Sequence, residues 1–344
     1  LQAYNGDQMA RELNMVAKHS IEKTAAQHAD CFTTVSDITA TECAQLLERR
    51  PIATPNGFEQ DLIPKGKEYI RKRKEARSAL INVAEKLVGH EIEEDAVLVA
   101  TSGRYEYKNK GIDVFIEALN KLRHIKQLKK DVVAFIMVPA WMKEPRADLV
   151  ERLSHKTVHG PLDHPFLTHW LHNLHEDNVL RQMAALGFQN SPDDRVKLIF
   201  VPSYLTGEDG VFNKTYYDLL IGMDVTAFPS YYEPWGYTPH ESVAFSVPTI
   251  TTTLAGFGLW NKKSGDKKGL DDGVEVIHRD DYNYFDVAQD ICDLIFEVSV
   301  KSDQQEKTMR QAALERSKLA DWKHFIKFYL QTYEEALVIA KKRL

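Results

Sequence analysis

The chain of 344 residues has an ordinary globular composition, with 43% apolar residues, 27% charged residues and a formal net charge of −6. Its length is typical of about two domains, and without a basic tract interleaved with aromatics nucleic acid is a poor candidate partner. No apolar run approaches the roughly 20 residues of a membrane span, and the start has no signal-peptide pattern. The cysteines, Cys31, Cys43 and Cys292, have neither the spacing of zinc ligands nor that of a disulfide framework. These observations favour the cytoplasm.

Short β-branched and apolar runs alternate along the chain with longer stretches of helical period. The runs predict strands at Cys31–Val35, Ala96–Ser102, Val132–Val138, Val196–Pro202, Asp224–Phe228, Pro248–Thr252 and Gly273–Ile277. The helical stretches lie near Ile112–Ile125, Ala147–Ser154, His164–Leu186, Tyr216–Gly222, Pro239–Phe245 and Tyr284–Val300. This alternation predicts a parallel, doubly wound α/β sheet of the Rossmann-like type. Such sheets bind ligands at the carboxyl ends of their strands, in the loops that lead into helices.

Turn signals and charge divide the chain into three parts. The segment Thr54–Leu62 carries a Pro-Asn-Gly turn and leads into the charged run KGKEYIRKRKEAR. We therefore expect residues 1–59 to be the end of a first domain and residues 60–320 to form a complete α/β domain. Residues 321–344 have aromatics at helical spacing, which predicts a long amphipathic helix that closes the domain or crosses back to the first.

The stretch YYEPWGYTPHE follows one predicted strand and contains two acids eight residues apart. Thr238 to Glu241 reads T-x-x-E with Pro239 at the first helical position, which predicts a capping box. The free N–H groups of such a helix start bind phosphate, and Gly236 lets the backbone approach a ligand closely. Glu233 would then face the group attached to a diphosphate, and Glu241 would accept hydrogen bonds from sugar hydroxyls. The alternatives are a capping residue, a solvated acid, or the carboxylate pair of a glycoside hydrolase.

The stretch SGRYEYKNKGID places Arg104, Lys108 and Lys110 after another predicted strand. Two of these cations would neutralise a leaving diphosphate, although an exposed charged turn is the simpler reading of this loop by itself. Together, a cationic clamp and an anion beside the sugar are what transfer from a nucleotide sugar requires, because charge builds on the diphosphate as the glycosidic bond breaks.

The chain resembles the glycogen synthases of the animal and fungal type in several stretches, namely GRYEYKNKGIDVFIEALNKL, FPSYYEPWGYTPHESVAFSVPTITTTLAGFG, CFTTVSDITATE, PNG and NSPDDRVKLIFVP. The resemblance extends from about residue 15 to about residue 335. It implies a retaining glycosyltransferase with the two-domain GT-B fold, in which two Rossmann-like halves face each other and the C-terminal half holds most of the donor.

The resemblance also implies roles for individual residues. Glu233 and Glu241 match the two glutamates of the family's E-x7-E motif, the first at the donor glucose and the reaction centre and the second at the ribose. The residues expected to bind the donor diphosphate are Arg104, Lys110, Gly236, Tyr237 and Thr238. Tyr204 and Tyr216 fall where the family sandwiches the nucleotide base, although either tyrosine is also explained as core packing.

The reaction implied is transfer of glucose, with retention, from UDP-glucose or ADP-glucose to the nonreducing 4-hydroxyl of an α-1,4-glucan such as glycogen. No cofactor and no metal are expected. Three alternatives remain: another GT-B glucosyltransferase, a phosphorylase, for which no pyridoxal phosphate lysine motif is found, and a noncatalytic glucan-binding or assembly module.

The sequence departs from the family in three places. It begins late, so we expect a fragment that keeps the donor site and has little synthase activity by itself. The arginine cluster that binds glucose 6-phosphate in the family is replaced by scattered cations, Lys307, Arg310, Arg316 and Lys318, which predicts no such activation. The region Lys143–Asn190 is short for the family's assembly insertion, which leaves homo-oligomerisation open.

Overall fold

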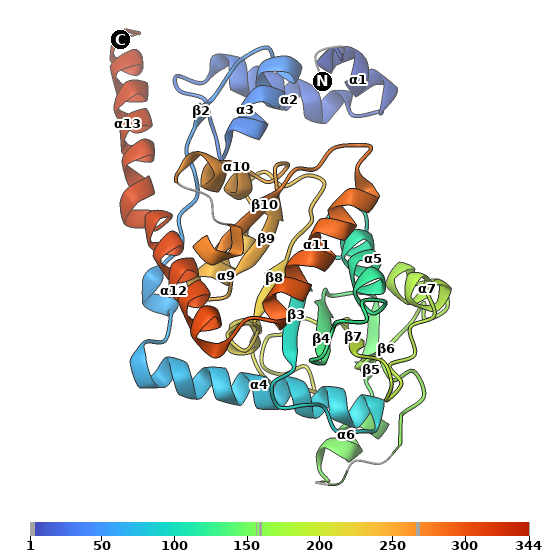
Figure 1. Ribbon diagram of the computed structural model, residues 1–344. Coiled ribbons are helices and arrows are strands. Elements are labelled where there is room, and N and C mark those ends of the chain that lie inside the picture. Colours follow the sequence, from blue (N-terminus) through green and yellow to red (C-terminus); the bar gives the residue numbers. More distant parts are fainter. Residues whose placement is uncertain (1–3, 156, 158–159, 266–268, 344) are drawn as a thin grey trace.

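The central element of the protein is a six-stranded parallel sheet, seen in a computed structural model that describes residues 4–155, 157, 160–265 and 269–343 (Figure 1). Its strands are β3 (Val97–Ser102), β4 (Val132–Met137), β7 (Val196–Val201), β8 (Val225–Ala227), β9 (Thr249–Thr252) and β10 (Val274–Ile277). They lie in the order β10-β9-β8-β3-β4-β7, which confirms the doubly wound sheet. The order reverses direction between β3 and β8, and a crevice at the carboxyl ends of two such strands is the usual ligand site of this architecture.

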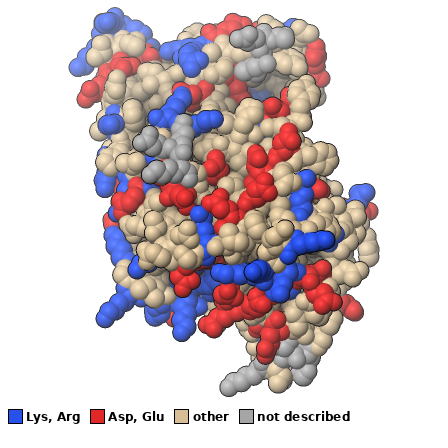
Figure 2. Space-filling model, in the orientation of Figure 1, with Lys and Arg blue, Asp and Glu red and all other residues tan. Residues whose placement is uncertain are grey.

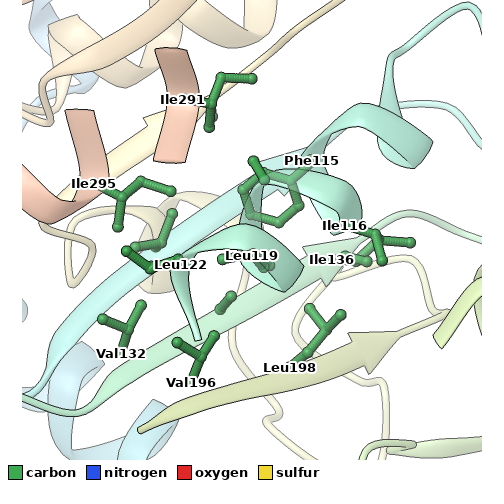
Figure 3. Packing of buried hydrophobic residues seen from close by; sticks show 14 of the residues in the cluster. Phe115, Ile116, Leu119, Leu122, Val132, Ile136, Val196, Leu198, Ile291 and Ile295 are labelled. Atoms are coloured by element: carbon green, nitrogen blue, oxygen red, sulfur yellow. The ribbon is translucent and has the colours of Figure 1, made fainter. Parts of the chain in front are cut away.

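Helices cover both faces of the sheet, so successive residues of a central strand enter different cores. Val97 and Val99 of β3 pack with α5 (Ile112–Leu122), α7 (Asn178–Ala185) and α11 (Tyr284–Ser299). Leu98 and Ala100 pack with α4 (Gly66–Val88) and α8 (Tyr216–Leu220). Figure 3 shows the first core, in which Phe115 of α5 lies near the α11 side chains. Burial of each large apolar side chain of this kind stabilises the folded state by about 1.5–3 kcal/mol.

Two long helices, α4 and α12 (Asp303–Leu319), lie in stretches for which the sequence pattern predicts no helix. The first contains the charged run KGKEYIRKRKEAR, and the second contains the scattered cations. The helix α4 buries small and branched residues, among them Ala76, Leu80 and Leu87, along one stripe. Its exposed cations, such as Arg71 and Lys74, lie on other faces, whereas Lys86 is buried. The helix α12 begins with a capping box between Ser302 and Gln305.

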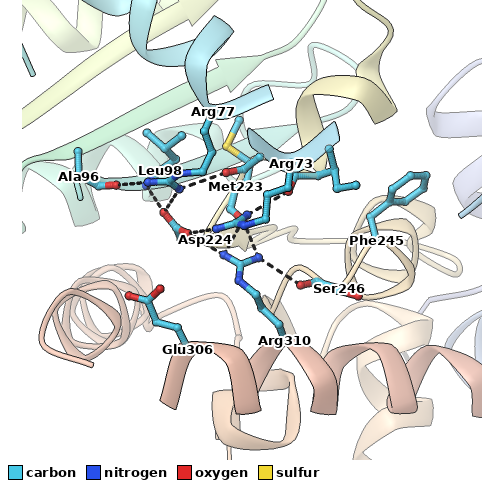
Figure 4. A network of polar contacts seen from close by, with 12 residues as sticks. Arg73, Arg77, Ala96, Leu98, Met223, Asp224, Phe245, Ser246, Glu306 and Arg310 are labelled. Atoms are coloured by element: carbon cyan, nitrogen blue, oxygen red, sulfur yellow. Dashed lines mark hydrogen bonds and ion pairs between the residues drawn. The ribbon is translucent and has the colours of Figure 1, made fainter. Parts of the chain in front are cut away.

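A buried carboxylate ties both of these helices to the sheet. Asp224, at the start of β8, accepts hydrogen bonds of 2.6 Å from Arg73 and Arg77 of α4 and from Arg310 of α12 (Figure 4). It also accepts one of 2.8 Å from the Leu98 N–H in β3. The four donors satisfy a charge that would be very unfavourable in the interior without them.

The helix predicted over His164–Leu186 is wrong in its first half. There the chain forms a strand, β6 (His169–Leu171), which pairs antiparallel with β5 (Met142–Pro145). The helix α6 (Ala147–Leu153) follows β5 in the chain. A new helix, α7, starts only after Asp177, whose side chain accepts from the Leu180 N–H at 3.1 Å. The N-cap aspartate, rather than the apolar spacing, determines where the helix starts.

Residues 4–53 form a separate group of short elements beside the sheet. They are α1 (Gly6–Glu12), α2 (Val16–His28), β1 (Thr33–Thr34), α3 (Asp37–Leu46) and β2 (Ile52–Ala53). The short helix η1 (Gln60–Leu62) lies instead beside α12, where the Gln60 side-chain amide donates to the Ser317 hydroxyl at 3.3 Å (Figure 1). The strand predicted at Cys31–Val35 is only two residues long, and it pairs with β2 rather than with the main sheet. The last helix, α13 (Trp322–Lys341), runs toward this group (Figure 1). Its predicted last residue, Leu344, lies outside the described residues.

The chain enters and leaves the sheet region at one place. The Phe58 N–H donates to the Ala320 carbonyl at 3.2 Å, and the Tyr329 hydroxyl on α13 donates to the Thr54 carbonyl at 3.0 Å. A Cβ on Gly57 would lie 2.5 Å from the Trp322 Cα, so only glycine allows the two segments to approach this closely.

The surface carries both signs of charge. On the face shown in Figure 2, Lys and Arg side chains alternate with Asp and Glu side chains. Within the described ranges, no helix combines the length and the apolar character needed to cross a membrane.

Candidate functional site

Two loops meet where the strand order reverses, one after β3 and the other after β8. Gly111 ends the first loop with φ +65° as the N-cap of α5, and a Cβ there would lie 2.1 Å from the Pro229 carbonyl oxygen of the second loop. The Tyr231 N–H donates to the Asn109 carbonyl at 2.7 Å. The backbones of the two loops are therefore in contact, as the strand order requires.

An ion pair joins the two predicted halves of the site. The Lys110 ammonium group donates to the Glu233 carboxylate, and the side chains are only 10% and 17% exposed. A Cβ on Gly103 would be 3.8 Å from Lys110 Cε and 3.9 Å from Thr238 Cγ2, so the start of the loop, the lysine and the helix start meet. The structure thus brings together a cation, an anion and a helix N-terminus that lie up to 128 residues apart in the sequence, from Lys110 to Thr238.

Arg104 lies on the same loop but at its outside. Its side chain is 76% exposed and bonds to Glu106 at 3.0 Å rather than to Glu233. The neighbouring Lys108 is paired with the buried Asp113 at 2.7 Å, which gives it a structural explanation. Of the three predicted cations, only Lys110 is held inside the site.

The capping box predicted at Thr238 is wrong. The helix α9 (Tyr237–Ala244) begins earlier, with Gly236 as its N-cap at φ +99°, so Pro239 is its third residue. The carboxylate of Glu241 does not turn back to the backbone but accepts a hydrogen bond from Tyr217. The first N–H groups of a helix have no partner within it, so those of Tyr237 and Thr238 are candidate donors to an anion.

Rings packed underneath hold this helix start in place. The Trp235 Nε1–H donates to His240 Nδ1 at 3.2 Å, and the His240 ring stacks on Phe257 with centroids 5.0 Å apart. Burial lowers the pKa of His240 to about 3, so the imidazole is neutral and can accept the hydrogen bond from the indole N–H. The sequence reading missed this support, although Trp235 and His240 both lie in the quoted motif.

The two predicted base-binding tyrosines lie on adjacent segments. The Tyr216 N–H donates to the Leu205 carbonyl at 3.0 Å, which places Tyr204 beside the start of α8. The Tyr204 side chain is 73% exposed, whereas Tyr216 is partly buried and its hydroxyl is 2.7 Å from that of Ser102 at the end of β3. Burial raises the pKa of Tyr216 above its usual range.

Glu241 is the second acid of the motif and lies apart from the ion pair. Its carboxylate accepts a hydrogen bond of 2.9 Å from the Tyr217 hydroxyl on α8. Burial raises the pKa of Glu241, and the Tyr217 bond opposes that rise. Tyr217 is a site neighbour that the sequence reading did not name.

Comparison with known protein families gives one match along most of the chain. The family described as glycogen synthase matches residues 1–164 and 149–342. The glycogen [starch] synthase of Neurospora crassa is 31% identical over 98% of this chain and 56% of its own length. Isoform 2 from Saccharomyces cerevisiae is 29% identical over 98% and 57%. The chain thus spans about half the length of the curated relatives it matches.

Solved structures resemble the chain in fold. Anabaena HepE in complex with UDP and glucose has a TM-score of 0.53 at 16% identity, over 92% of this chain and 66% of that one. A sucrose-phosphate synthase from Thermosynechococcus elongatus has a TM-score of 0.52 at 18% identity, over 94% and 62%. These likenesses confirm the GT-B glycosyltransferase fold.

Proposed function

Because the chain belongs to the glycogen synthase family, we propose that it carries the donor site of a retaining glucosyltransferase. The reaction is transfer of glucose from a nucleoside diphosphate glucose to the nonreducing 4-hydroxyl of an α-1,4-glucan. The observation that carries the proposal is the Lys110–Glu233 ion pair, which lies beside the start of α9 at the reversal of strand order.

The positive groups at this edge act on the diphosphate. Lys110 and the N–H groups of Tyr237 and Thr238 stabilise the negative charge that grows on the leaving diphosphate. The exposed guanidinium of Arg104 adds a second cation from the solvent side. Because these groups supply the positive charge, the proposal includes no metal ion and no cofactor.

Glu233 acts on the sugar. Once the diphosphate competes for Lys110, the Glu233 carboxylate is released to stabilise positive charge on the glucose or to bind its hydroxyls. Glu241 accepts hydrogen bonds from the ribose, and the base lies between Tyr204 and Tyr216. Aromatic stacking tolerates either uracil or adenine, so these residues fit UDP and ADP alike.

The proposal extends to organisation and location. Residues 1–59 belong to a first Rossmann-like domain and residues 60–320 to the donor domain, a division supported by the separate β1–β2 pair. Residues 321–344 connect the two. The enzyme acts in the cytoplasm, where its three free thiols stay reduced.

Calorimetric titration of the chain with UDP and with ADP tests the donor site. We expect saturable binding of at least one nucleotide. We also expect Arg104→Ala to weaken it about tenfold or more, because a charge-assisted hydrogen bond contributes about 1.5–3 kcal/mol. The matched control is Arg71→Ala, which removes an exposed arginine from an Arg–Glu pair on α4 and should leave binding unchanged. Absence of saturable binding with both nucleotides would contradict the proposal.

Glucose 6-phosphate is expected not to bind. Of the four cations that stand in place of the family's arginine cluster, Arg310 is bonded to Asp224 and Lys318 to Glu315. Engaged and scattered cations make a weak phosphate site. Calorimetric titration with glucose 6-phosphate at millimolar concentration should give only heats of dilution, and a saturable isotherm would show that this prediction is wrong.

A further inference from the structure

The side chain of Tyr217 packs in a cluster with two other rings. Its ring stacks on Phe245 with centroids 4.8 Å apart and an interplanar angle of 14°, and the edge of Phe58 packs at 6.3 Å. Phe58 and Phe245 also contact each other, with centroids 6.4 Å apart, and a tyrosine packed into such a cluster has little freedom to turn, so its hydroxyl has a fixed direction. That direction is toward Glu241, whose Oε1 accepts at 2.9 Å.

Tyr217 keeps its proton and therefore acts as the donor. Burial and the Glu241 charge raise the pKa of the Tyr217 hydroxyl above its usual range. The other titratable groups that face Glu241 are the hydroxyls of Tyr216 on α8 and Tyr237 on its own helix. Tyr217 bonds to Oε1 of Glu241, and within the described part of the chain no hydrogen bond to Oε2 is found, so Oε2 can accept from a ligand hydroxyl.

The two adjacent tyrosines of α8 have different partners. Thr215 starts this short helix by accepting from the Asp218 N–H at 3.3 Å. Successive side chains on a helix point about 100° apart, so Tyr216 reaches Ser102 at the end of β3 while Tyr217 reaches Glu241 on α9. The family resemblance assigned only the first of them to the nucleotide.

We propose that Tyr217 is a positioning residue of the donor site, which holds the Glu241 carboxylate in the direction that accepts the ribose hydroxyls. This inference rests on the proposed function, because it takes the ligand of Glu241 to be the ribose of a nucleoside diphosphate. Removing the Tyr217 hydroxyl should weaken nucleotide binding without removing any group that touches the nucleotide.

The test is calorimetric titration with UDP, and with ADP if ADP is the nucleotide bound, between pH 5.5 and 8 for the wild type and Tyr217→Phe. We expect Tyr217→Phe to bind about three- to tenfold more weakly at pH 7.5, the loss of one hydrogen bond to a charged group. The bond favours ionised Glu241, so its loss raises the pKa of that carboxyl. As the pH is lowered, nucleotide binding by Tyr217→Phe should therefore begin to weaken at a higher pH than nucleotide binding by the wild type. A merely structural contact would not move this pH profile.

The matched control is Tyr69→Phe. The Tyr69 hydroxyl donates to the Phe245 carbonyl at 3.3 Å, so this variant removes a hydroxyl from the same ring cluster without touching Glu241. It should bind nucleotide like the wild type at every pH. In the Glu241→Ala background, which leaves the Tyr217 hydroxyl without this acceptor, adding Tyr217→Phe should weaken binding no further. Wild-type affinity and pH profile in Tyr217→Phe, or additive losses in the double variant, would overturn the inference.

A nucleotide-free measurement separates this inference from the proposed function. The carboxyl carbon of Glu241 is followed by NMR against pH, with its signal identified by its loss in Glu241→Gln. A higher titration midpoint of Glu241 in Tyr217→Phe, together with nucleotide binding by the wild type, supports both the inference and the proposed function. If that shift occurs but the wild type binds neither nucleotide, the contact is real, whereas the proposed function and the role in donor binding both fail. If the midpoint is unchanged while the wild type binds, only the inference is wrong.

Discussion

Asp224→Ala is expected to lower the free energy of unfolding by about 3–5 kcal/mol, the usual cost of removing one partner from a buried ion pair. Three guanidinium groups would lose their shared carboxylate, and their side chains are only 12–20% exposed. The Leu98 N–H would lose its acceptor as well. Urea unfolding followed by circular dichroism measures the change.

Two further variants make this result specific. Asp224→Asn keeps a hydrogen-bond acceptor but loses the charge, so its loss of stability should be intermediate. Glu315→Ala removes an exposed carboxylate that pairs with Lys318 at 2.7 Å, and it should change stability by no more than about 0.5 kcal/mol. A loss below about 1 kcal/mol in Asp224→Ala would show that the cluster does not hold the helices on the sheet.

The pH dependence follows from the direction of the shift. Burial alone would raise the pKa of Asp224, but Arg73, Arg77 and Arg310 hold it well below its usual range. A carboxyl with a depressed folded-state pKa stabilises the fold at pH values above its unfolded pKa of about 3.9. That contribution is lost as the pH falls below this value. The stability difference between wild type and Asp224→Asn should therefore be full at pH 7 and shrink in acid.

Lys110→Met is expected to lower nucleotide affinity by about 10- to 150-fold. The substitution keeps much of the apolar stem but removes a buried cation from the edge where the diphosphate is proposed to lie. A hydrogen bond between charged groups contributes about 1.5–3 kcal/mol, which corresponds to this range. Calorimetric titration with UDP and ADP measures it, with thermal unfolding as a check that the variant folds.

Glu233→Gln supplies the contrasting result. It removes the anion that competes with the diphosphate for Lys110, so affinity for the nucleotide should stay the same or rise. Opposite responses of the two partners would distinguish a diphosphate-binding lysine from one that only neutralises Glu233. Equal losses of binding in both variants would mean that the pair is structural.

The sequence predicts the sheet well because of where its strands lie. Both faces of the sheet are covered, so Val132–Met137 is a continuous apolar run and Val196–Val201 is interrupted only by Lys197, and both stand out from their surroundings. The helix α4 was missed for the converse reason. Its buried stripe contains small residues such as Ala76 and Ala84, and lysines and arginines are concentrated in its first half.

The site was predicted where it depends on strand order and missed where it depends on packing between helices. Lys110 and Glu233 follow two strands that the doubly wound pattern makes neighbours, so their meeting could be expected. The T-x-x-E pattern at Thr238 was misleading because Gly236 begins the helix earlier and Glu241 finds Tyr217, 24 residues away in the chain. No local sequence pattern predicts how the helices α8 and α9 pack against each other.

The hydrogen bond between Phe58 and Ala320 means that the segment between these residues begins and ends at the same point. A segment whose ends already touch loses little conformational entropy when it is closed on itself or grafted into another chain. The 261 residues between them, 59–319, can therefore be exchanged as a cassette between related enzymes, with its two junctions side by side. The chain that receives the segment would need a glycine and a tryptophan at the places of Gly57 and Trp322, because their close approach aligns the junctions.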